Sequence, residues 1–241
     1  AQYRTMTRDL PDAGATASMS RQVIPLVAVY GLRPELTLGL RQTYEFRSRT
    51  MMGSATDVSG FGDLHVFAKY KVLRINTRSH VVGVSPTLAI EPPTGADGIS
   101  SDAWNLAAGV YLSGRSGSLG VDLDVGYGWN GFAGVSADAA EPGDRFAVDA
   151  AVAYQIPLGG SARAALAPVF EISWYDQFAD SRDGADLPAT GERVFSLAPG
   201  LKYTLDDLIL EGLVRFPVAQ EQEGMEMEAG VMVLLGVRRM F

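Results

Sequence analysis

Apolar and polar residues alternate along most of this chain. Between positions 35 and 50, every second residue from Leu36 to Phe46 is apolar or an uncharged Gln or Tyr, while the positions between carry Arg41, Glu45 and Arg47 among others. Successive side chains of a strand point to opposite faces, so a period of two predicts a strand. The run far exceeds the usual five or six residues, and a tilted strand needs about 9–11 residues to cross a bilayer. The pattern therefore predicts membrane-crossing strands.

The same alternation returns along the whole chain, and no stretch of helical length with a period of 3.6 competes with it. It predicts an all-β protein that forms a single domain over residues 1–241. We expect twelve strands, near residues 1–9, 20–31, 35–50, 60–74, 76–92, 102–115, 118–131, 143–157, 160–177, 190–205, 207–221 and 225–241.

The predicted connections alternate between tight and long. The tight ones are 32–34, Ile75, 116–117, 158–159 and Asp206; the longer ones, around 10–19, 51–59, 93–101, 132–142 and 178–189, are rich in small and polar residues. The last link, 222–224, is short although it falls on the long side. Barrels of the bacterial outer membrane have short periplasmic turns and longer extracellular loops. We therefore expect an up-and-down antiparallel transmembrane β-barrel in the outer membrane, with both termini periplasmic.

Aromatic residues support the barrel. Tyr and Trp gather at the expected strand ends on the apolar face, as membrane-interface belts require. The chain also ends in Phe241, and a terminal aromatic on an amphipathic last strand resembles the assembly signal of outer-membrane barrels. A soluble β-sandwich is the alternative, but strands of this length are hard to bury in a sandwich core. We expect outer-membrane lipid, including lipopolysaccharide, to surround the apolar face.

Composition narrows the function. The net charge of −8 argues against a nucleic-acid partner, because phosphate binding needs clustered cations. With no Cys and only two His, disulfides, thiolate metal sites and multi-His zinc sites are excluded. No apolar run approaches the roughly 20 residues of a membrane helix. We expect no metal, cofactor or catalytic residue.

Two segments resemble a known family. Residues 30–40, YGLRPELTLGL, and 60–71, GFGDLHVFAKYK, are similar to sequence blocks of the outer-membrane transporters named for the meta-pathway of phenol degradation. Residues 91–95, EPPTG, followed by a strand and Leu123–Tyr127, resemble a third block, in which Asp124 replaces the usual Asn. The resemblance covers roughly residues 20–241. It implies an outer-membrane barrel that takes up small, often aromatic, molecules.

If the apolar positions face lipid, the charged positions face the lumen. A basic wall then stands across from a mostly acidic one, and the candidate lumen residues are Arg41, Glu45, Arg47, Lys69, Lys71, Asp122, Asp124, Asp149, Glu171, Glu211 and Arg215. These charges either set up a transverse field in a water-filled pore or fill a narrow barrel with salt bridges. Many small inward residues favour a narrow, partly occluded channel for passive uptake of small solutes.

Two other functions remain open. A sealed barrel could serve a structural role or hold a protein partner, although no feature identifies such a partner. Some outer-membrane barrels are lipid-modifying hydrolases, and His65 with Asp63 and a loop serine could imitate a catalytic triad. No Gly-x-Ser-x-Gly motif occurs, and His80 is expected on the lipid-facing side near a turn. We therefore predict a channel without enzymatic activity.

Overall fold

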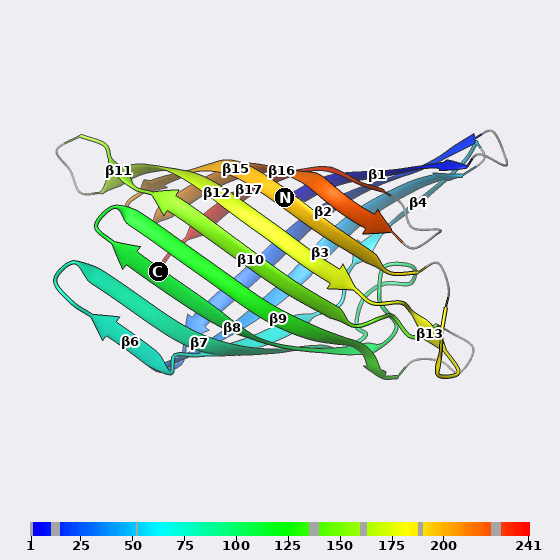
Figure 1. The fold of residues 1–241 in the computed structure, drawn as a ribbon, viewed down its shortest axis with the longest axis horizontal. Coiled ribbons are helices and arrows are strands. Elements are labelled where there is room, and N and C mark those ends of the chain that lie inside the picture. The colour runs from blue at the N-terminus through cyan, green and yellow to red at the C-terminus, as the bar shows by residue number, and fades with distance from the viewer. Residues whose placement is uncertain are drawn as a thin grey trace.

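The computed structural model describes residues 2–10, 15–51, 53–134, 140–159, 163–187, 190–222 and 228–241. Throughout these ranges the regular structure is β-strand, and the pairs are antiparallel (Figure 1). Fifteen strands form one sheet and two form a separate hairpin. In the described part of the chain there is no helix long and apolar enough to span a membrane. The all-β antiparallel fold predicted from the alternation is confirmed.

Most strands are long, and consecutive long strands are neighbours. The strands are β1 (Gln2–Leu10), β2 (Ala15–Gly31), β3 (Leu36–Met51), β4 (Ser54–Phe61), β5 (His65–Tyr70), β6 (Leu73–Asn76), β7 (His80–Glu91), β8 (Trp104–Ser116), β9 (Leu119–Ala133), β10 (Arg145–Tyr154), β11 (Ile156–Pro157), β12 (Ala164–Gln177), β13 (Ser181–Arg182), β14 (Ala185–Asp186), β15 (Glu192–Leu205), β16 (Leu208–Gln222) and β17 (Glu228–Arg239).

The large sheet curls until its ends meet. Its order is β10-β9-β8-β7-β5-β3-β2-β1-β17-β16-β15-β12-β11, with β4 beside β3 and β6 beside β7. The first strand of this order, β10, also pairs with β12 near its other end, from Arg145 opposite Gln177 to Ala153 opposite Val169. The N-terminal and C-terminal strands pair as well, through β1 and β17. Among the described strands, such closure leaves no long unpaired edge, which a strand in lipid cannot tolerate.

The two ends of the barrel differ. One, called the turn end here, carries the short links 32–35, 77–79, 117–118 and 206–207, while the other, the loop end, carries the longer described link 92–103. Figure 1 shows both kinds of connection at opposite ends of the tilted strands. The loop end also holds the small β13–β14 hairpin, which the sequence analysis places in a loop.

Several predicted boundaries are wrong. The stretch 51–59 was expected as a long link, but β4 pairs with β3 up to Met51 opposite Ser54. The tight link predicted at Ile75 lies instead at 77–79, because Ile75 pairs with Val82. The predicted strand 60–74 is divided between β4, β5 and β6, and 143–157 between β10 and β11. Local alternation does not reveal such breaks, and the predicted count of twelve strands stays a prediction.

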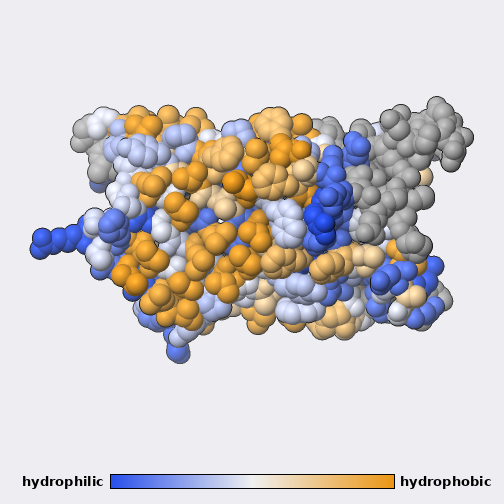
Figure 2. Space-filling model, viewed as in Figure 1, coloured by the Kyte–Doolittle hydropathy of each residue, from blue (hydrophilic) through white to orange (hydrophobic). Residues whose placement is uncertain are grey.

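The exposed and buried positions follow the predicted parity. On β3, Leu38, Leu40 and Phe46 are 40%, 48% and 44% exposed, whereas Glu45 on the other face is 4% exposed. In Figure 2 hydrophobic side chains gather over the middle of the visible face and hydrophilic ones toward its ends. A soluble sandwich would bury those large apolar residues. Burial here is instead confined mostly to small and polar side chains on the inner face.

Exposed aromatic side chains lie near both ends of the strands. Tyr30, Tyr70 and Tyr154 are exposed beside the turn end, while Trp104, Trp129 and Phe132 are exposed beside the loop end. Aromatic pairs such as Tyr127 with Trp129 and Phe146 with Trp174 reinforce the loop-end group. Aromatic rings prefer the boundary between headgroups and hydrocarbon. The two groups therefore bracket an apolar zone suited to lipid.

Candidate functional site

The inner face of the barrel carries a buried carboxylate that holds two arginines. Glu45 of β3 accepts bonds from Arg21 of β2 at 2.7 and 2.9 Å and from Arg47 at 3.0 Å. Its side chain is only 5% exposed. A buried carboxylate is tolerated when it is paired and hydrogen-bonded. Two predicted lumen residues, Glu45 and Arg47, thus pair with each other within one wall, and Arg21 is a further partner that was not among the predicted residues.

The link between β7 and β8 is tied to the wall by Asp63. This residue follows Gly62 in the gap between β4 and β5, and its carboxylate accepts the backbone N–H groups of Thr94, Gly95 and Ser101, each at 2.8 Å. The Ser100 and Ser101 hydroxyls donate to it at 2.7 and 3.0 Å. The structural role considered for Asp63 therefore accounts for its contacts.

Arg47 holds the same loop over the lumen. Its guanidinium donates to the carbonyls of Gly98 at 3.3 Å and Ile99 at 3.1 Å. Gly95 lies close to the wall, since an added Cβ would be 2.9 Å from the carbonyl carbon of Gly62. The loop is therefore seated inward by the Arg47 guanidinium of β3 and the Asp63 carboxylate from the gap between β4 and β5.

Three adjoining cavities lie inside the barrel. The loop cavity, beneath the β7–β8 link, has a volume of about 610 Å³. The middle cavity of about 410 Å³ shares Arg41 and Glu91 with it. The lysine cavity of about 340 Å³ shares His65, Ala89, Ala107 and Gly126 with the middle one. The shared residues make these spaces neighbours along the inner face of β3, β5, β7 and β9.

The loop cavity is strongly charged. Its lining is Arg21, Val23, Pro25, Val27, Arg41, Thr43, Glu45, Arg47, Gly62, Asp63, Glu91, Ile99, Ser100, Ser101 and Met232. Three arginines face three carboxylates, and most of these charges are engaged with one another or with the loop. Arg41 differs, because among the described residues it makes one distant ion pair, 3.9 Å from Glu91.

The lysine cavity contains a cation that lies on an aromatic ring. Lys69 Nζ is 3.5 Å from the centroid of Tyr111, and the Tyr111 hydroxyl donates to Asp122 at 2.6 Å. Phe67 also lines this cavity, next to Gly39 on the neighbouring strand. A Cβ at Gly39 would be 2.0 Å from the Phe67 ring, so glycine is needed to accommodate the phenyl group.

Acidic side chains gather on β9, β10 and β12. Asp124 is directly opposite Asp149, and Asp122 and Glu171 are both opposite Ala151, on either side of β10. Arg215 pairs with Glu171 at 3.4 Å, and Arg238 pairs with Glu211 at 3.2 Å. The predicted acidic side is therefore partly neutralised by arginines of β16 and β17. Lys71 donates to the carbonyl of Pro34 at 2.5 Å, which places it at the turn end.

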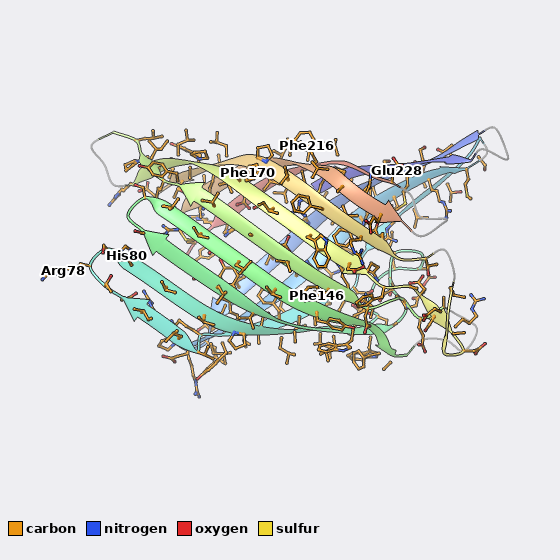
Figure 3. The ribbon with its side chains drawn as sticks, in the orientation of Figure 1. Arg78, His80, Phe146, Phe170, Phe216 and Glu228 are labelled. Carbon is orange, nitrogen blue, oxygen red and sulfur yellow. The ribbon has the colours of Figure 1, made fainter. Side chains whose placement is uncertain are left out.

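The triad-like arrangement considered for a hydrolase is not assembled among these residues. Asp63 binds the two loop serines, whereas His65 Nδ1 lies 3.4 Å from Glu91. His80 lies near Arg78 at the turn between β6 and β7, which belongs to the turn end of the barrel (Figure 3). Groups of His, Asp and Glu suited to a metal ion are absent from the described residues.

Comparison with known proteins places this barrel in a family. A family model described as "Putative MetA-pathway of phenol degradation" matches residues 6–227. The chain belongs to this family. The resemblance noted in the sequence is thus confirmed, and a search of curated proteins yields no match.

Solved structures with a similar fold are outer-membrane barrels. An outer membrane channel from Pseudomonas putida F1 has a TM-score of 0.69 at 18% identity, covering 100% of this chain and 93% of that one. The β domain of the Bordetella autotransporter BrkA scores 0.56 at 15% identity, with 100% and 97% covered. The NanC porin scores 0.52 at 14% identity, with both chains fully covered at 100%. These likenesses establish the fold of a transmembrane β-barrel.

Proposed function

We propose that this protein is a channel of the bacterial outer membrane through which small solutes diffuse passively along a charged lumen. The observation that carries the proposal is the row of three adjoining cavities inside a closed sheet whose outer face is apolar. Charged side chains in a confined pore select and orient solutes. The family membership and the channel and porin among the similar folds agree with this function.

The same proposal orients the barrel. The turn end, where β17 ends with Arg239 opposite Leu208, faces the periplasm, and the loop end faces the outside, as in other barrels of this class. The two aromatic groups contact the lipid interfaces, with lipopolysaccharide around the loop end. Passage requires no cofactor and no catalytic step.

Conductance of the full-length protein in a planar lipid bilayer tests the proposal. We expect discrete current steps that require the folded barrel. Small steps are expected because the β7–β8 loop and the Glu45 cluster occupy part of the lumen. Current no different from that of protein-free bilayers would contradict the proposal.

The second candidate is a sealed barrel with a structural role. The inward seating of the β7–β8 loop by Asp63 and Arg47 is the observation in its favour. The two candidates differ in one measurement, because a sealed barrel inserts into the bilayer without conducting.

A further inference from the structure

The middle cavity combines two cationic side chains with a smooth floor of small residues. Its lining is Arg41, His65, Ala89, Ile90, Glu91, Asn105, Leu106, Ala107, Gly126, Tyr127, Gly128, Asn130, Arg145, Ala147 and Gln177. A volume of about 410 Å³ lies at the small end of ligand-binding cavities. We propose that the middle cavity is a binding site for small organic carboxylates that have an apolar body. The inference deepens the proposed channel function, on which it rests for solute access.

The floor suits an apolar body. Ala89, Ala107, Gly126, Gly128 and Ala147 come from the inward positions of four neighbouring strands, β7 to β10. Side chains of this size leave the sheet almost flat and expose little polar surface. A flat hydrocarbon group can therefore lie against the wall and displace water from it.

Arg41 supplies a charged hydrogen-bond donor at one side. It lines both the middle and the loop cavities, its side chain is 46% exposed, and Glu91 approaches it only to 3.9 Å. Glu91 is held at the same time by His65 at 3.4 Å and by the Asn105 amide at 3.2 Å. Glu91 can thus orient Arg41 without occupying its N–H groups, which match a carboxylate in geometry.

Arg145 stands on a different part of the lining. Its guanidinium lies over the ring of Tyr175, 3.9 Å from the centroid, which fixes the plane of the guanidinium. The two arginines come from β3 and β10, so a carboxylate between them would meet positive charge from two walls.

Two nearby acidic groups, Asp144 and Glu192, are engaged by their own donors. Asp144 accepts the Tyr127 hydroxyl at 2.8 Å and the Asn130 N–H at 3.0 Å, and Glu192 accepts the Tyr175 hydroxyl at 2.5 Å. Among the charged side chains that line the cavity, two arginines face one glutamate. An anionic head group can therefore use the N–H donors of Arg41, which an organic cation cannot.

Equilibrium binding to the full-length barrel in detergent tests the site, with benzoate, benzyl alcohol, benzylamine and inorganic phosphate as probes in calorimetry. We expect benzoate to bind at least about tenfold more tightly than the other three, since a charge-assisted hydrogen bond is lost with the alcohol. Equal binding of benzoate and benzyl alcohol, or phosphate binding as tightly as benzoate, would overturn the proposal.

Variants locate the site. Arg41→Gln should weaken benzoate binding about tenfold or more, and Arg41→Lys should restore part of it. Arg163→Gln is the matched control, because Arg163 pairs with Asp206 near the turn end and lines none of the three cavities. Heat-dependent gel mobility checks that each variant is folded. Equal weakening by Arg41→Gln and Arg163→Gln in folded protein would overturn the site.

The binding result and the conductance result separate the two proposals. Benzoate binding that depends on Arg41 supports the site even in a barrel that carries no current, and in that case the channel function alone fails. Current steps in a protein that binds benzoate and benzyl alcohol equally would leave the channel function and remove the carboxylate site.

Discussion

Single residues decide how charge is distributed inside the barrel. Glu45 pairs with both Arg21 and Arg47, while Glu171 and Glu211 are paired with Arg215 and Arg238. The predicted contrast between a basic and an acidic wall is therefore reduced by pairs within a strand, between neighbouring strands and, for Glu171 with Arg215, across β15. Arg41 and Lys69 are the predicted basic residues that line cavities without a close carboxylate contact in the described residues.

Reversing the charge of Arg41 and Lys69 tests their influence on ions. In the double variant Arg41→Glu and Lys69→Glu, we expect a severalfold shift of the permeability ratio toward cations, because carboxylates replace cations along the solute path. The measurement is the reversal potential in a salt gradient. Arg163→Glu, at the turn end, serves as control, and unchanged selectivity in the double variant would count against the transverse-field interpretation.

Neutralising Glu45 tests the buried cluster. Glu45→Gln leaves two guanidinium groups without their shared carboxylate, and we expect the free energy of unfolding to fall by about 1–3 kcal/mol. Urea unfolding of the barrel in lipid vesicles measures it. Glu35→Gln, an exposed change at the link before β3, should have little effect. An equal loss in both variants would show that Glu45 has no special role.

At the scale of elements, the break between β4 and β5 is linked to the β7–β8 loop. Gly62–Leu64 leaves the strand pattern, and Asp63 in that gap binds the loop through five hydrogen bonds. A continuous strand would have presented this carboxylate differently. The break between β4 and β5 and the attachment of the β7–β8 loop therefore depend on the same residue, Asp63.

Replacing Asp63 tests that arrangement. Asp63→Asn removes the charge and one acceptor oxygen, so charge-assisted bonds worth about 1.5–3 kcal/mol each are weakened. We expect faster hydrogen exchange at the amides of Thr94, Gly95 and Ser101, followed by mass spectrometry. Asp57→Asn on β4 is the control. Unchanged exchange in the Asp63 variant would show that other contacts hold the loop.

At the scale of the whole molecule, the closed sheet has an exposed apolar zone that is suited to a membrane. Because the two ends of the barrel differ, the barrel can be inserted in two distinguishable orientations. The chain contains no Cys, so a single introduced thiol can report which end faces outward. Ala185 lies in the loop-end hairpin and Arg78 at the turn end.

Labelling of intact cells tests the orientation. With a maleimide polymer too large to cross the outer membrane, we expect Ala185→Cys to react and Arg78→Cys to react only after the cells are lysed. The reverse pattern would invert the proposed topology, and with it the periplasmic placement of the end of β17.

The sequence by itself determined the fold class and the direction of each face. Alternation is a local property, because neighbouring side chains of a strand point to opposite sides whatever the strand pairs with. That is why Leu38 and Leu40 could be assigned to the outside and Glu45 to the inside without coordinates. The family blocks at 30–40 and 60–71 added the outer-membrane setting.

Only the tertiary structure decided which charges meet. Arg21 reaches Glu45 because the register between β2 and β3 brings the two side chains together. Arg41 of β3 lines the middle cavity together with residues of β8, although β5 and β7 lie between these two strands in the sheet. Asp63 meets Ser101 because a loop from a later hairpin folds inward. Partners of this kind depend on strand register, stagger and loop path, which are set by contacts between segments far apart in the chain.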